Sequence, residues 1–142
     1  MQKMTPKLWE QVKHFRPDGP DVWGDPHQMA ASIVFGIDRY RKYIGRPVNV
    51  HCGWEYRASG GWHPNGCAVD VDVEGMHVID QYLAAERFDE FNGIGVYPNW
   101  NNPGLHLDTR PHKKTGIDSR WGCLESGVYV KLDKEFFKSI MD

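Results

Sequence analysis

The chain has 142 residues, of which 40% are hydrophobic and 25% are charged, and this balance predicts one folded domain over residues 1–142. Its 17 basic and 19 acidic residues give a formal charge of −2, so the charge gives no reason to expect a nucleic-acid partner. No apolar run approaches the roughly 20 residues that cross a bilayer, which predicts that no segment spans a membrane.

The first ten residues lack the apolar segment of a secretory signal peptide, which predicts a protein made in the cytoplasm without such a signal. The three cysteines, Cys52, Cys67 and Cys123, are odd in number and form no Cys-x-x-Cys pair. We therefore expect reduced, buried thiols rather than a cysteine-rich zinc site.

One loop and one helix are predicted in the first third of the chain. Residues 16–26 are rich in proline, glycine and aspartate and predict an ordered loop. Asp25 and Pro26 follow the pattern of an N-cap and a first helical residue, which predicts a helix over 27–44. Its core-facing stripe, ending before Gly45, consists of apolar residues at helical spacing: Met29, Ile33, Ile37, Tyr40 and Ile44.

Alternation of apolar and polar residues predicts strands further along the chain. These are residues 48–52, 67–73, 93–97 and 105–109, with another strand or hairpin in 121–131. Helices are predicted over 77–90 and, capped by Asp133, near the end. The pattern predicts a small α+β domain: a mainly antiparallel sheet with helices packed on one side.

Two predicted strands each have one apolar face and one face that carries metal-type side chains. Asp70 and Asp72 alternate with valines, and His106 and Asp108 alternate with leucines. If the two strands pair, Asp70 and His106 come within reach of one ion in a cleft on the sheet. We expect Asp72 to make local hydrogen bonds instead.

A third ligand candidate, His63, precedes the first of these strands. The Pro-Asn-Gly turn over 64–66 would bend the chain so that His63 returns toward Asp70. Two imidazoles and a carboxylate are the ligand set of an open zinc site, which keeps a position for water.

These residues carry a family resemblance. His63-x6-Asp70, then Gly-Ile-Gly-Val-Tyr-Pro from Gly93, then Leu-His-Leu-Asp-Thr-Arg from Leu105 resembles the M15 zinc peptidases over 47–121. The most similar branch is the D-Ala-D-Ala carboxypeptidase-like and peptidoglycan-hydrolase members of bacteria and their phages. The resemblance implies a compact α+β fold of the hedgehog type and one zinc ion per chain, held by His63, Asp70 and His106.

The resemblance also implies an activity. It is hydrolysis of an amide bond in the peptidoglycan stem peptide, with a zinc-bound water as nucleophile. A phage lysis enzyme, released to the cell wall through a holin, or a virion component would fit, and we expect a monomer. D-Ala-D-Ala carboxypeptidases, L-Ala-D-Glu endopeptidases and cross-link endopeptidases share this ligand set, so the bond that is cut stays open.

The resemblance assigns Arg57 to hold a carboxylate or polarise the scissile carbonyl, although its spacing to His63 is shorter than in many relatives. Relatives keep a general base two or three residues before the last ligand, where this chain has Gly104 and Pro103. The base therefore stays open. The candidates are Asp108, Glu55 and His112, and Asp108 is also a candidate for a carboxylate that orients a ligand.

The missing base supports an alternative function, a non-catalytic zinc-binding module that binds peptidoglycan or a protein partner. A domain with this fold and no metal is a third interpretation. The polar loop 98–103 is a candidate specificity loop. The aromatic residues near the site are candidate cleft walls, of which a subset could stack on a sugar or a stem peptide: Trp54, Trp62, Tyr97, Trp100 and Trp121.

Overall fold

The computed structural model of the chain describes residues 1–111 and 119–141. Within these residues the chain forms four helices and six strands. The helices are α1 (Pro6–Gln11), α2 (Ala31–Ile44), α3 (Val78–Ala85) and α4 (Lys134–Ser139). The strands are β1 (Val48–Cys52), β2 (Ala68–Val73), β3 (Gly93–Tyr97), β4 (Gly104–Asp108), β5 (Ser119–Glu125) and β6 (Val128–Val130).

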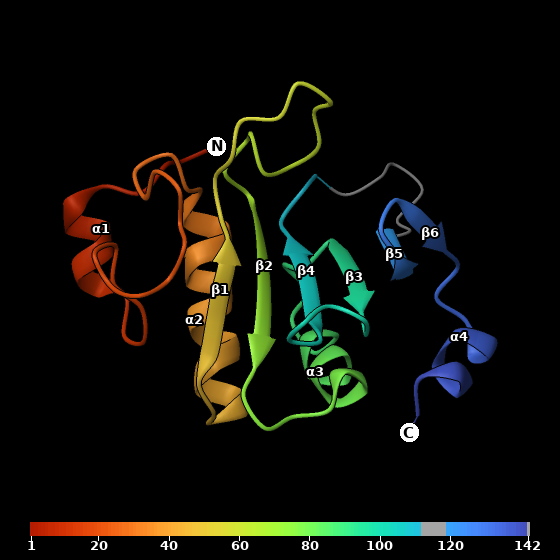
Figure 1. The fold of residues 1–142 in the computed structure, drawn as a ribbon. Coiled ribbons are helices and arrows are strands. Elements are labelled where there is room, and N and C mark those ends of the chain that lie inside the picture. Colours follow the sequence, from red (N-terminus) through yellow and green to blue (C-terminus); the bar gives the residue numbers. More distant parts are fainter. Residues whose placement is uncertain (112–118, 142) are drawn as a thin grey trace.

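The six strands form one sheet in the order β1-β2-β4-β3-β5-β6. All neighbours are antiparallel except β3 and β5, which run parallel. Helix α2 packs behind β1 and β2, and α3 packs behind β3 and β4 (Figure 1). The α+β prediction, with a mainly antiparallel sheet and helices on one side, is confirmed.

The core lies between this helix layer and the apolar face of the sheet. Fully burying a branched aliphatic side chain stabilises a fold by roughly 1.5–3 kcal/mol, and both layers contribute such residues. From the strands come Val69, Val71, Ile94, Val96, Leu105 and Leu107, and from α2 come Ile33, Val34 and Ile37, all with no exposed surface. Helix α4 extends the layer, since the rings of Phe137 and Tyr82 of α3 lie 5.4 Å apart.

The predicted start of the second helix is wrong by several residues. Asp25 accepts a hydrogen bond from the backbone N–H of His27, which closes a local turn rather than capping a helix. Ala30 is extended because its N–H bonds to the Gly66 carbonyl, and the N–H of Ala31 bonds to the Gln2 carbonyl. Tertiary pairing thus delays the helix to Ala31. Its end at Gly45, which has a left-handed φ of 70°, agrees with the prediction.

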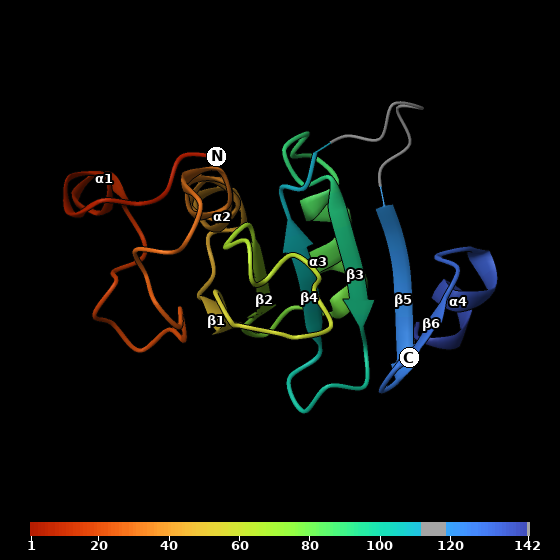
Figure 2. The ribbon, with the colours of Figure 1, turned by 90° about the horizontal axis from the view of Figure 1, so that it is seen from above.

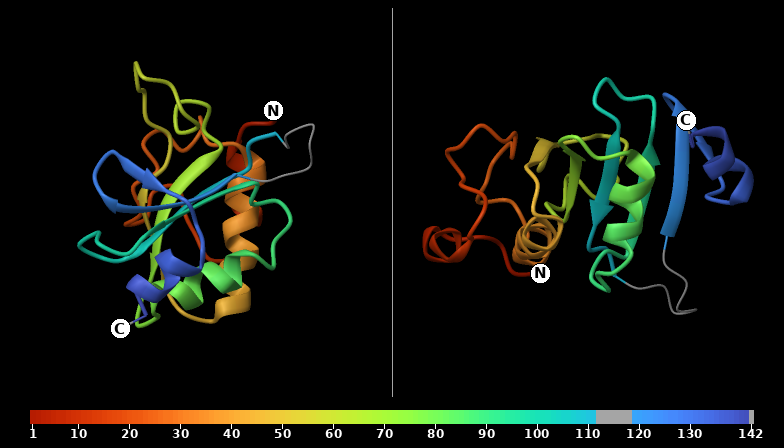
Figure 3. Two further views of the ribbon diagram at one scale, coloured as in Figure 1. Left: turned by 90° about the vertical axis from the view of Figure 1, so that its right-hand side faces the viewer. Right: turned by 90° about the horizontal axis from the view of Figure 1, so that it is seen from below.

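Helix α1 was not predicted from the sequence, although Thr5-Pro6 carries a start signal. The Thr5 hydroxyl accepts from the N–H of Leu8, and Pro6 occupies the first turn. Seen from below, α1 lies beside α2, beyond the β1 edge of the sheet (Figure 3). The predicted cap at Asp133 is confirmed, since its carboxylate accepts from the N–H of Phe136.

The long connection between β1 and β2 lies over the face of the sheet that α2 leaves uncovered (Figure 2). This loop therefore brings its side chains to the polar face of β2 and β4. All three cysteines are free, as expected, and Cys67 and Cys123 are buried. Among the described residues, no helix is long and apolar enough to cross a membrane.

Candidate metal centre

The polar face of β2 and β4 carries the site. The two strands pair antiparallel with Asp70 directly opposite His106, so both side chains rise from neighbouring positions on one face. The next strand, β3, has Gly93 and Gly95 on that face. A Cβ at Gly93 would lie 2.3 Å from the Asp108 carboxylate, and one at Gly95 would lie 2.5 Å from the Trp121 ring. The two glycines therefore make the room that the site occupies.

His63 reaches the site from the loop that precedes β2. The N–H of Gly66 bonds to the His63 carbonyl and closes the predicted turn. The residue is 2% exposed, and its Nε2 lies 3.3 Å from Oδ1 of Asp70. His106 approaches the same oxygen, with its Nδ1 at 3.2 Å. One carboxylate oxygen thus faces one nitrogen from each of two imidazoles.

The other nitrogen of each ring has a fixed partner. Nδ1–H of His63 donates to the Gly53 carbonyl at 2.7 Å, because a carbonyl oxygen can only accept. Nε2–H of His106 donates to Oδ2 of Asp108, also at 2.7 Å. Metal-binding histidines characteristically donate their second nitrogen to a carbonyl or a carboxylate in this way. A metal ion bound here would have His63 Nε2, Asp70 Oδ1 and His106 Nδ1 as candidate ligand atoms.

Asp108 is fully buried, and donors surround its carboxylate. Besides His106, it accepts from the backbone N–H of Arg110 and, at 2.8 and 2.7 Å, from the Nε and Nη2 of that guanidinium. Arg110 itself lies between the rings of Trp62 and Trp121, 5.3 Å from each centroid. A carboxylate with four hydrogen bonds orients His106; it has no free position from which to take a proton.

In the metal-free protein, neighbouring groups shift the pKa values of His63, Asp70 and Asp108. Burial alone would lower the pKa of His63, but the hydrogen bonds to Asp70 and Cys52 outweigh it and raise this pKa to about 10. Burial alone would raise the pKa of Asp70, but His106 and His63 hold it well below its usual range. Burial acts likewise on the pKa of Asp108, which Arg110 and His106 hold low. The metal-free site thus holds a proton on His63 where a cation would bind.

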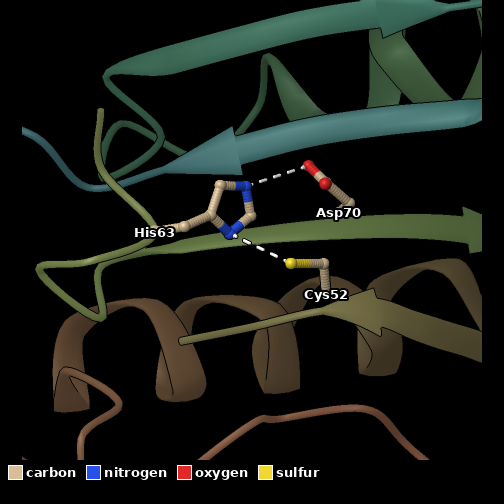
Figure 4. Close-up of side chains that lie close together, drawn as sticks. All are labelled: Cys52, His63 and Asp70. Atoms are coloured by element: carbon tan, nitrogen blue, oxygen red, sulfur yellow. Dashed lines mark hydrogen bonds and ion pairs between the residues drawn. The ribbon is translucent and has the colours of Figure 1, made fainter. Parts of the chain in front are cut away.

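Cys52 joins this cluster, as Figure 4 shows. Cys52, His63 and Asp70 form a group that could hold a metal ion, since one ligand atom of each lies within 4.8 Å of the others. The Cys52 sulfur lies 3.6 Å from Nδ1 of His63. That nitrogen already donates to Gly53, so Nε2 is the nitrogen of His63 left for a metal ion, and Cys52 is a candidate ligand beside His106.

Simple alternation along β1 would turn Cys52 to the helix face together with Val48 and Val50. The β1–β2 register shifts between Val50 and Cys52, and Cys52 then pairs with Asp70. Such a bulge re-aims the side chain that follows it. The sequence analysis missed Cys52 for this reason, because no residue in the strand signals the bulge.

The two catalytic candidates of the β1–β2 loop, Glu55 and Arg57, lie at the rim. Their side chains are 53% and 40% exposed, and Arg57 Nε donates to Oε2 of Glu55 at 2.6 Å. Both approach the Cys52 sulfur at 3.8 Å, so one side chain separates them from His63. The third candidate for the base, His112, lies outside the described residues.

Asp72 is likewise placed outside the ligand set. Its carboxylate contacts the ring of His51 and, at 3.4 Å, the amide of Asn49. This agrees with the expected local hydrogen bonding. The sequence analysis also missed Arg110, which completes the partners of Asp108; its only signal is the spacing Asp-x-Arg in the segment after His106.

The chain was compared with protein-family models, curated proteins and solved structures, and none of them matches it.

Proposed function

We propose that the protein is a zinc-dependent peptidase that hydrolyses an amide bond in the peptidoglycan stem peptide. One observation supports this most. Two imidazoles direct their remaining nitrogens at one oxygen of Asp70, while Gly53 and Asp108 hold the opposite nitrogens. Three protein ligands are the number that catalytic zinc sites use, whereas structural sites use four.

A bound zinc ion would polarise a carbonyl and make a hydroxide nucleophile available near neutral pH. The residues of the chain supply the rest. The carbonyl of Gly53 and the carboxylate of Asp108 fix the two rings, so that little reorganisation is needed when substrate binds. Arg57 lies at the rim, where its exposed guanidinium can bind a substrate carboxylate or carbonyl.

The proton acceptor in this proposal is Glu55. Asp108 is saturated by donors, and the Glu55 carboxylate is half exposed with Arg57 as its hydrogen-bond partner. A substrate group that engages Arg57 would release this carboxylate. The geometry thus favours Glu55 among the candidates of the described residues.

The test is turnover on purified peptidoglycan. We expect the zinc-loaded protein to release free amine, a chelator to stop the release, and added zinc to restore it. Mass spectrometry of the digested muropeptides then identifies the bond. Absence of amine release by a chain that carries one zinc would contradict the proposal.

The saturated state of Asp108, together with Pro103 and Gly104 at the positions where relatives keep a base, favours one alternative. This is a non-catalytic zinc module that binds peptidoglycan or a protein partner. It predicts sedimentation of the zinc-loaded protein with peptidoglycan and no new amine. Glu55→Gln separates the two functions, since it should abolish turnover in a peptidase and leave cosedimentation unchanged in a binding module.

A further inference from the structure

A cavity of about 440 Å³ opens beside the candidate metal centre. Three of its lining residues belong to the sheet and three to the loop between β3 and β4: His51, Cys52, Asp70, Trp100, Asn101 and Asn102. Asp70 lines the cavity and also faces both histidines, so a ligand that fills the cavity extends to the site.

The indole of Trp100 forms a fixed wall of this cavity. Its ring stacks on Tyr97, with centroids 4.2 Å apart and an angle of 15° between the planes. The Tyr97 hydroxyl accepts from the indole N–H of Trp121 at 3.0 Å, and the Trp121 ring contacts His106. Tyr97 itself does not line the cavity. A ring held in this way loses little freedom when a ligand binds.

The loop that carries Trp100 is anchored at both ends. The amide of Asn99 donates to the Leu124 carbonyl of β5 at 2.8 Å. At the other end, the buried amide of Gln81 in α3 donates to the Pro103 carbonyl at 3.1 Å. The loop is therefore a built part of the cavity.

The polar groups of the loop are available to a ligand. Within residues 1–111 and 119–141, the indole N–H of Trp100 and the amides of Asn101 and Asn102 have no hydrogen-bond partner. The indoles of Trp9, Trp23, Trp54 and Trp121 all donate, whereas that of Trp62, like that of Trp100, has no hydrogen-bond partner among the described residues. No lysine or arginine lines the cavity, and its ionisable lining residues are His51, Cys52 and Asp70.

An aromatic face, an indole donor and two carboxamides match an uncharged ligand rich in hydroxyl and amide groups. We propose that this cavity binds an N-acetylated amino sugar of the glycan strand, with the sugar face on Trp100 and its acetamido and hydroxyl groups on Asn101 and Asn102. As a substrate subsite, this inference rests on the proposed function; sugar binding itself does not.

The first experiment titrates zinc-loaded, ¹⁵N-labelled protein with N,N′-diacetylchitobiose. We expect shifts of the Trp100 indole N–H and of the Asn101 and Asn102 side-chain amides. Trp100→Ala should weaken binding of the disaccharide about tenfold or more, as the loss of one aromatic contact predicts. Asn101→Ala removes an exposed loop side chain and should also weaken binding. The control is Tyr43→Ala, an exposed aromatic of α2 that does not line the cavity.

The second experiment compares a stem peptide with the same peptide attached to its disaccharide. Trp100→Ala should raise KM for the glycan-linked peptide about tenfold more than KM for the free peptide. Disaccharide binding that is absent, or equal in Trp100→Ala and Tyr43→Ala, would overturn the sugar subsite even if the protein hydrolyses peptides. Shifts caused by the free peptide in place of the sugar would also overturn it. Sugar binding at Trp100 without any hydrolysis would instead contradict only the peptidase.

Discussion

The buried centre and the exposed rim of the site are built in different ways. At the centre, His63, His106 and Asp108 lie on or against strands, and each ring has both nitrogens facing a defined partner. At the rim, Glu55 and Arg57 lie in a loop and their side chains bond chiefly to each other. Strands fix the orientation of their side chains, whereas side chains on loops can change their hydrogen-bond partners. We therefore expect changes at the centre to remove the metal and changes at the rim to affect only turnover.

The largest effect should follow loss of a ligand. Asp70→Asn, His63→Ala and His106→Ala should each lose the bound zinc and all hydrolysis, because an open site with two ligands holds the ion poorly. Elemental analysis measures zinc per chain, and circular dichroism checks the fold.

The matched control is Asp72→Asn, the same change two residues along the same strand face. It should retain one zinc per chain. A ligand variant that retains both zinc and turnover would remove that residue from the centre.

The next effect separates the two roles of Asp108. If the carboxylate orients His106, Asp108→Asn should lower zinc affinity by roughly 10–100-fold, as loss of such a partner typically does. Turnover should then recover at saturating zinc. Unchanged zinc affinity with a collapsed kcat would mean that Asp108 is the base after all.

A smaller effect is expected at the rim. Arg57→Ala should lower kcat/KM roughly tenfold through loss of one charged hydrogen bond to substrate, and zinc content should not change. Arg87→Ala serves as control, because Arg87 is exposed and lies over Tyr43, away from the site. Loss of zinc in Arg57→Ala would show that the rim and the centre are not independent.

A further prediction concerns the proton that zinc displaces. With a pKa of about 10, His63 is protonated at neutral pH in the metal-free protein, and zinc must displace that proton. Zinc affinity should therefore rise about tenfold per pH unit between about pH 7 and 9. Calorimetry in buffers of different ionisation enthalpy should detect about one proton released by His63; His63→Ala should lack it.

The same pKa has a consequence for stability. Because the pKa of His63 in the fold lies above its ordinary 6.5, its contribution to the metal-free fold is complete below pH 6.5 and is lost as pH rises toward 10. Denaturant unfolding of metal-free protein across this window should show the decline. A stability that rises with pH there would contradict the charge state assigned to His63.

The alternation of apolar and polar residues correctly predicted which side chains share a face of the sheet. Alternation placed Asp70 and His106 on one face, and the register of β2 and β4 then set them opposite each other. It could not reveal the bulge that turns Cys52 into the site, because a bulge depends on the pairing of two strands. Nor could it show that donors saturate Asp108, since the bidentate contact with Arg110 depends on how the chain leaves β4.

The same limit explains the misplaced helix start. Asp25-Pro26 is a sound local signal, but the partners of Ala30 and Ala31 are Gly66 and Gln2, far away in the chain. Local patterns predicted most elements, and long-range hydrogen bonds decided the rest.

The most direct measurement is a crystal structure of the zinc-loaded protein with anomalous data at the zinc edge. We expect one ion within roughly 2.0–2.2 Å of His63 Nε2, His106 Nδ1 and an Asp70 oxygen, with Asp108 still bonded to His106 Nε2. An ion held by the Cys52 sulfur in place of His106, or no ion at this position, would contradict the account.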